Sequence, residues 1–195
     1  QALSANTTGA YNTAVGHESL LVNTTGQKNV AVGYETLKAS TTATENVAVG
    51  YQALKANVVG SGCVALGPYA LIAQNGNVTG NIAIGQASMY ENLTGTTNTA
   101  MGHDSLRLST AGHRNVAIGF KALRDNTASD NAAFGYESLA DNTTGTYNTS
   151  VGNYSLYTNT IGQKNVAVGT DALRASTTAD ANVAVGYQAL KANVT

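Results

Sequence analysis

Residues 29–37 read Asn-Val-Ala-Val-Gly-Tyr-Glu-Thr-Leu, and close variants of this stretch recur along the whole chain of 195 residues. Counted from one repeat to the next, its glycine returns about every 17 residues. A period this regular is typical of one structural unit stacked along an axis. The sequence therefore predicts a solenoid rather than a globular core with a pocket. The repeat glycines are Gly16, Gly33, Gly50, Gly67, Gly85, Gly102, Gly119, Gly135, Gly152, Gly169 and Gly186.

The residues before each glycine alternate in character. With the glycine as position zero, position −1 is always large and apolar, and position −3 is mostly Val, Ile or Thr. Position −2 is alanine except for Ser150, and position −4 is asparagine except for Cys63. This alternation predicts a β-strand with −1 and −3 on one face and −2 and −4 on the other. A helix would not tolerate glycine, asparagine and β-branched residues at these recurring places.

The residues after each glycine complete the coil. Position +4 is leucine, or Met89 in one repeat, and we expect it to reach the core from a second short strand. Turn-forming residues follow, as in Asn-Thr-Thr-Gly at 23–26. One coil then consists of two short strands and two bends, with the glycine at a bend or a close backbone approach. Stacked about 4.8 Å apart, eleven coils give an all-β parallel β-solenoid roughly 50 Å long.

Asparagine at −4 predicts a ladder inside this stack. Each residue of a coil lies over its counterpart in the next, so that the side-chain amides can hydrogen-bond up and down the rod. Cys63 would interrupt the ladder, and as a lone cysteine it is most simply a small buried thiol. The predicted ladder residues are Asn12, Asn29, Asn46, Asn81, Asn98, Asn115, Asn131, Asn148, Asn165 and Asn182.

Composition argues against several classes of protein. The formal net charge is −1, from 10 basic and 11 acidic residues, so that no basic surface suggests nucleic acid or an anionic membrane as partner. No apolar run approaches the roughly 20 residues that span a bilayer, and no basic-then-apolar stretch at the start of the given sequence resembles a signal peptide. Because the chain opens and stops in the middle of a repeat, we expect residues 1–195 to be a single repetitive segment of a longer fibrous protein.

Residues that could carry chemistry are scattered. His17 and His103 are five coils apart and His113 falls in a turn, so that no metal site is expected. No nucleophile motif is present, and the sequence predicts neither an enzyme nor a cofactor. The acidic residues at +2 predict a loose, solvated outer row. These residues are Glu18, Glu35, Asp104, Glu137 and Asp171.

Aromatic residues recur at +1 and form a possible surface binding stripe. They could bind glycans or protein, or they could pack one chain against another, and packing is the favoured alternative. The residues of this stripe are Tyr34, Tyr51, Phe120, Tyr136 and Tyr187.

The coil is too thin for a stable monomer, and we expect copies of the chain to associate. Each coil supplies only three large apolar side chains, at −3, −1 and +4, to be buried. The Asn-Ala-Gly face is built from small residues and would let another chain approach closely. Residues 6–58 also recur at 142–194, which is how a fibre lengthens without a new design.

Two stretches carry a resemblance to a known family. Asn29-Val30-Ala31-Val32-Gly33 and residues 81–85, Asn-Ile-Ala-Ile-Gly, resemble the head repeats of trimeric autotransporter adhesins. With Asn-Thr-Thr-Gly between phrases, the chain is also similar to shafts of phage tail fibres. The resemblance implies a left-handed β-roll, a homotrimer, and an extracellular, cell-surface or virion location. It also implies a structural and adhesive role, with a host-surface protein or glycan as a partner.

Two other functions compete with the fibre. An ice-binding solenoid would use a threonine row at +8, although position +10 is mostly glycine and a second row is missing. A solenoid enzyme that cleaves polysaccharides would need a cluster of acids or bases that the sequence lacks. The threonines at +8 are Thr7, Thr24, Thr41, Thr110, Thr127, Thr143, Thr160 and Thr177.

Overall fold

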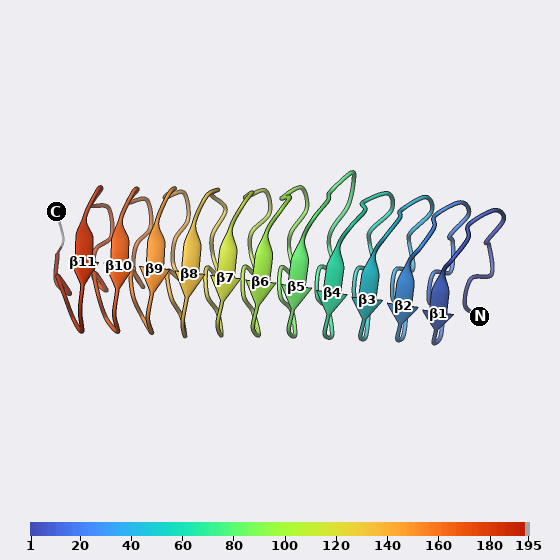
Figure 1. Cartoon of the computed structure of the whole chain (residues 1–195), viewed down its shortest axis with the longest axis horizontal. Coiled ribbons are helices and arrows are strands. Elements are labelled where there is room, and N and C mark those ends of the chain that lie inside the picture. Colours follow the sequence, from blue (N-terminus) through green and yellow to red (C-terminus); the bar gives the residue numbers. More distant parts are fainter. Residues whose placement is uncertain (194–195) are drawn as a thin grey trace.

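The computed structural model describes residues 1–193 and shows an all-β parallel solenoid, as the sequence predicts. Eleven strands of three residues form one sheet in chain order, so that the rod runs from the N-terminus to the C-terminus without a crossover (Figure 1). The strands are β1 (Thr13–Val15), β2 (Val30–Val32), β3 (Val47–Val49), β4 (Val64–Leu66), β5 (Ile82–Ile84), β6 (Thr99–Met101), β7 (Val116–Ile118), β8 (Ala132–Phe134), β9 (Thr149–Val151), β10 (Val166–Val168) and β11 (Val183–Val185).

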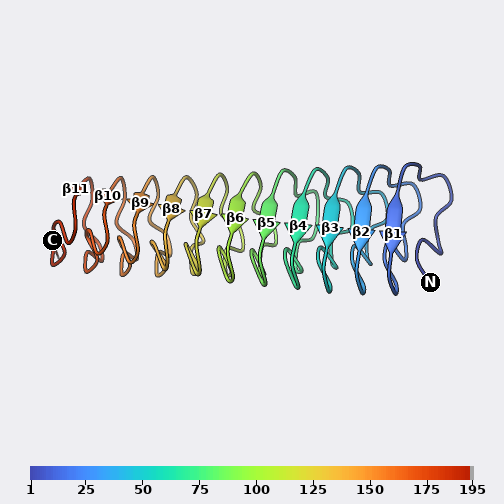
Figure 2. The ribbon, with the colours of Figure 1, turned by 60° about the horizontal axis from the view of Figure 1, so that its bottom comes forward.

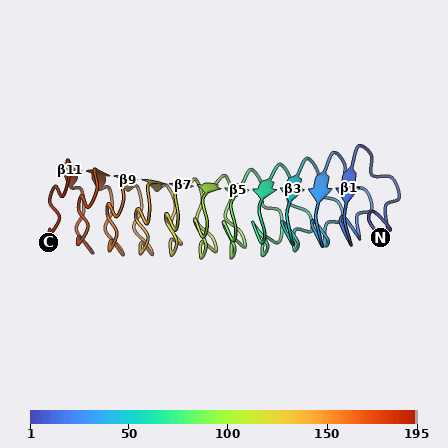
Figure 3. The same cartoon turned by 90° about the horizontal axis from the view of Figure 1, so that it is seen from below.

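The strands stay in register although the coils differ in length. Val30 pairs with Val47, 17 residues on, whereas Val64 pairs with Ile82 across an 18-residue coil. Val116 pairs with Ala132 across a 16-residue coil. The extra or missing residue is therefore absorbed in the turns. All strands keep to one side of the rod, and the sheet twists gradually along it (Figures 2 and 3).

The two faces of the sheet differ in residue type as predicted. The face with the large side chains, which was expected to be buried, is exposed, and the face with the small residues is buried. Ala31 and Asn29 are fully buried, and the same holds for their counterparts in the central coils, whereas the side chains at −3 and −1 point outward. The interior is narrow and already holds the leucine of each coil, so that only a small residue, alanine or in one coil Ser150, fits opposite it on the strand. Asparagine also finds backbone partners only inside. The small-residue face is thus not free for another chain.

The leucine at +4 reaches the core from a turn, and the predicted second strand is wrong. Over residues 1–193 each coil has one strand. Leu37 and Glu35 have φ angles of 50° and 52°, in the left-handed region, so that extended pairing cannot continue. Hydrogen bonds between coils persist nevertheless, since Leu37 N donates to Ala53 O at 3.1 Å. The core row at +4 comprises Leu20, Leu37, Leu54, Leu71, Met89, Leu106, Leu123, Leu139, Leu156 and Leu173, all fully buried.

Within the described part of the chain, no helix has the length and apolar character needed to cross a membrane.

Candidate functional site

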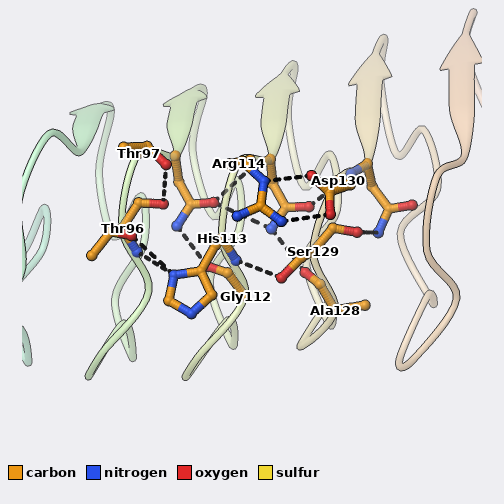
Figure 4. A network of polar contacts seen from close by, with 11 residues as sticks. Thr96, Thr97, Gly112, His113, Arg114, Ala128, Ser129 and Asp130 are labelled. Atoms are coloured by element: carbon orange, nitrogen blue, oxygen red, sulfur yellow. Dashed lines mark hydrogen bonds and ion pairs between the residues drawn. The ribbon is translucent and has the colours of Figure 1, made fainter.

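The asparagines at −4 join neighbouring coils through both ends of the side-chain amide. Asn98 Oδ1 accepts a hydrogen bond from the backbone N–H of Asn115 at 2.9 Å. Asn98 Nδ2 donates to the carbonyl oxygen of Gly112 at 2.7 Å (Figure 4). Equivalent bonds link each ladder asparagine to the next, from Asn12 through Asn29 to Asn46 and again along the later coils from Asn81 to Asn182. The amides thereby satisfy buried backbone groups that the short strands leave unpaired.

Cys63 occupies the gap in this row. Its backbone N–H still donates to Asn46 Oδ1 at 2.9 Å, while Nδ2 of Asn81 donates to Gln74 Oε1 at 3.3 Å and to the carbonyl oxygen of Gly95 at 2.7 Å. Gln74 reaches into the space instead, with its Nε2 3.4 Å from Cys63 Sγ. Burial raises the pKa of the Cys63 thiol, so the thiolate form is suppressed and the side chain acts as a packing residue.

A second inner row of polar side chains lies at position +7, and sequence reasoning missed it. Asn159 Nδ2 donates to Asn142 Oδ1 at 2.9 Å and to the carbonyl oxygen of Gly162 in its own turn at 3.1 Å. In the sequence these residues look like part of a polar surface turn. Their recurrence about every 17 residues as Asn, Ser or Gln could nevertheless have indicated a row of equivalent side chains along the rod. The buried members are Asn23, Ser40, Asn57, Gln74, Asn92, Ser109, Asn126, Asn142, Asn159 and Ser176.

The repeat glycines lie where consecutive coils come closest. Gly33 has a φ of +139°, and a Cβ there would meet the carbonyl oxygen of Gly50. From Gly16 to Gly169 each glycine faces the next in this way, and each has a φ between +121° and +139°. Any side chain would push two coils apart, which is why the period is marked by glycine and not by another small residue.

The outward face of the sheet forms a continuous surface that we call the apolar strip, made of the side chains at −3 and −1. It carries no charged residue from Thr13 to Val185. Large apolar side chains on it are exposed, from 36% at Ile118 to 69% at Val185. Large contiguous apolar patches on a protein surface are typical of sites that contact another protein, a membrane or a ligand. The exposed members are Val15, Val47, Val49, Ile82, Met101, Ile118, Phe134, Val151, Val168, Val183 and Val185.

Charges beside the apolar strip neutralise one another along the rod. Lys28 Nζ lies 3.0 Å from Glu45 Oε1 in the next coil. Arg114 makes a bidentate pair with Asp130, at 2.6 and 2.8 Å (Figure 4). Next to this pair, His113 Nδ1 accepts from the backbone N–H of Thr96 at 3.1 Å. These polar side chains tie coils together, and in these coils the charges beside the strip are paired.

The aromatic stripe is stacked upon itself. The rings of Tyr34 and Tyr51 are 5.3 Å apart at 7°, and His17 stacks on Tyr34 at 5.1 Å. Phe120 and Tyr136 repeat this arrangement at 5.0 Å and 15°. Their ring faces cover one another and leave mainly edges exposed, so the stack joins coils within one chain. Tyr187, near the end of the rod, is 74% exposed.

The acidic row at +2 is solvated only in part. Glu35, Asp104 and Asp171 are each less than 10% exposed, which the sequence interpretation did not foresee. Glu35 lies 2.7 Å from both Lys38 and Lys55. Hydrogen bonds from these two ammonium groups lower the pKa of Glu35 from 4.5 to about 2. Such pairs hold the turns of neighbouring coils together.

Clusters of metal-ligating side chains and surface grooves are the remaining places where chemistry could occur. Among residues 1–193 no three His, Cys, Asp or Glu side chains lie close enough to hold a metal ion. A surface groove of about 620 Å³ lies over Ala39 and Ala56 and is bordered by Val22, Ile72 and the two lysines that pair with Glu35. Its lining is apolar and contains no acid, base or nucleophile that is free to react.

No family model, curated protein or solved structure matches this chain.

Proposed function

We propose that this chain is a structural rod segment of a fibrous protein, in which copies of the chain assemble side by side. The observation that supports the proposal is the apolar strip, which runs along all eleven strands and carries no charged residue. Leaving such a strip in water is unfavourable, and covering it with another apolar surface releases the ordered water. A rod that is held together by ladders yet exposes one apolar side is suited to lateral assembly.

The partner that fits the strip best is a second copy of the same chain. A copy offers the same row of side chains at the same coil spacing, so that contact can extend over the full length of the rod. The pairing of Lys28 with Glu45 and of Arg114 with Asp130 reduces the repulsion between copies at these places along its border. A homotrimer, with three strips facing a common axis, is the assembly that the adhesin resemblance implies.

The wider role follows from the same resemblance. A trimeric autotransporter adhesin head or a phage tail-fibre shaft places such a rod outside the cell or on a virion. There it holds a distal tip, or its own loops, against a host-surface protein or glycan. The rod itself would perform no catalysis, carry no cofactor, bind no nucleic acid and insert into no membrane.

Light scattering and small-angle X-ray scattering on the purified chain test the assembly and the rod shape separately. We expect an elongated particle with the mass of three chains. Val116→Glu combined with Ile118→Glu places charge in the middle of the strip and should give the mass of one chain with the circular dichroism unchanged. Thr25→Glu combined with Thr144→Glu is the matched control on exposed turns and should stay assembled. A wild-type chain that remains monomeric at high concentration contradicts lateral assembly, and a compact particle contradicts the rod.

Ice binding is the second candidate, because the threonines at +8 line up in two stretches of coils, which Val58, Asn75 and Leu93 separate. Thr143 Oγ1 donates to the carbonyl oxygen of Thr160 at 2.9 Å, and Thr160 Oγ1 donates to Thr177 at 3.1 Å. These hydroxyl protons are directed along the rod and not toward a surface lattice. Position +10 is occupied by buried glycines such as Gly162, so the second row is missing. Zero thermal hysteresis would remove this candidate.

A further inference from the structure

The loop between β4 and β5 is the part of the rod that departs most from the repeat. It belongs to the 18-residue coil and rises above the loops beside it (Figure 1). Within this loop Gln74 and Val78 are buried, whereas the three residues between them, Asn-Gly-Asn at 75–77, are exposed. These three residues form a small tip that lies outside both inner rows.

Asn75 differs from the ladder asparagines in what surrounds its amide. Its Oδ1 accepts a hydrogen bond from the backbone N–H of Gly76 at 2.8 Å, which brings the side-chain amide next to the following backbone nitrogen. Gly76 has a φ of +84°, and nothing lies within 4 Å of the position that a Cβ would take. Asn75-Gly76 is also the one Asn-Gly pair in the sequence.

The ladder asparagines are protected from the same chemistry. The amide of Asn98 is bonded to Gly112 and Asn115 on the next coil, and the residue that follows it is the β-branched Thr99. A side chain held at both ends cannot turn toward its own backbone. A branched neighbour further shields the nitrogen that would have to attack.

We propose that Asn75 is a site of spontaneous deamidation, with water as the only co-reactant. Hydroxide removes the N–H proton of Gly76, and the nitrogen then bonds to Cγ of Asn75. The side-chain amide nitrogen takes up a proton and leaves as ammonia, which closes a five-membered succinimide. Water adds to either carbonyl of this ring and opens it to aspartate or to isoaspartate.

The modification would change the loop and spare the rod. It converts a neutral amide into a carboxylate, and isoaspartate also lengthens the backbone by one methylene. Because the tip at 75–77 contributes to neither inner row, the coils on both sides keep their hydrogen bonds. The loop would therefore collect negative charge with age while the solenoid stays intact.

Peptide mapping by mass spectrometry after timed incubation of the intact chain at neutral and mildly alkaline pH tests this proposal. We expect the amide-to-acid mass change at Asn75, at a rate that rises with pH and is several-fold faster than at the equally exposed Asn77, which precedes Val78. Enzymatic methylation of isoaspartate should label the same peptide. Asn75→Gln should abolish the change and leave the circular dichroism unaltered. Deamidation of Asn75 no faster than that of Asn77, or first at a ladder asparagine, would overturn the proposal.

Discussion

The backbone N–H of Asn115 donates to Oδ1 of Asn98 at 2.9 Å, across the 17 residues that separate two coils. The backbone N–H of Asn98 itself donates to Oδ1 of Asn81 at 2.9 Å. One side-chain row thus satisfies backbone donors at the same place in successive coils. These donors lie just before the three-residue strands, whose own pairing does not reach them. A buried donor without a partner costs about 1–3 kcal/mol.

Replacing Asn98 by alanine should destabilise the rod more than its small loss of volume suggests. The change leaves the N–H of Asn115 and the carbonyl of Gly112 without partners, and both residues are buried. We expect a loss of about 1–3 kcal/mol for each group, measured as a shift in urea unfolding. Asn77→Ala, at an exposed tip, is the control and should leave the midpoint unchanged. Equal effects of the two changes would argue against the ladder as a source of stability.

A methyl group at Gly119 should separate two coils. The Cβ of alanine would meet the carbonyl oxygen of Gly135, and the φ of +137° adds strain for any L side chain. We expect Gly119→Ala to lose at least about 2–3 kcal/mol and to raise hydrogen exchange most in the coils beside the change, because a solenoid couples nearest neighbours. Gly62→Asn should be tolerated, since Gly62 has a φ of +66° and open space around it. Uniform exchange along the whole rod would contradict this local effect.

The sequence alone predicts the length of the coil and the place of the one strand before each repeat glycine correctly. The alternation before Gly33 predicts a short strand, and β2 covers Val30–Val32. Its 17-residue recurrence predicts the parallel pairing of Val30 with Val47. Both follow from periodicity, which depends only on the order of residues.

Which side of the strand faces inward could not be read from the same pattern. Alternation shows that Ala31 and Val32 lie on opposite faces, and burial of the larger residue is the usual outcome. Here the interior is filled by Leu37 and its counterparts and by two polar rows, so that alanine goes in and valine comes out. The volume available inside depends on the closed coil, and no local stretch of sequence reports it. The left-handed backbone of Leu37 could not be predicted from the local sequence either. Leucine rarely adopts this conformation, and here burial and hydrogen bonds between coils hold it in place.

That conformation makes the leucine row sensitive to branching. Leu106 has a φ of 48° and is fully buried. Leu106→Val removes a methylene and forces a β-branched side chain into the left-handed region, so we expect a loss of about 2–4 kcal/mol in urea unfolding. Leu106→Met should cost less than about 1.5 kcal/mol, because Met89 already occupies this position in another coil with a φ of 51°. A valine variant as stable as the methionine variant would show that the backbone there is not under strain.

The stability of the rod should fall in acid partly through Glu35. Its pKa is lowered from 4.5 to about 2 by Lys38 first and Lys55 second, so the folded chain binds this proton less readily than the unfolded chain does. The stabilisation is therefore complete above about pH 4.5 and disappears as the pH falls toward 2. In urea unfolding across this range, the difference between the wild type and Glu35→Gln should shrink as the acid is added.

Glu45→Gln provides the matched control, because Glu45 pairs with Lys28 at an exposed place where solvent screens the charges. Its difference from the wild type should stay small between pH 4.5 and 2. The interpretation of the Glu35 cluster fails if Glu35→Gln differs from the wild type by the same amount at both ends of this range. Such a result would mean that the side chain acts through packing and neutral hydrogen bonds, and that its charge contributes nothing to joining the turns.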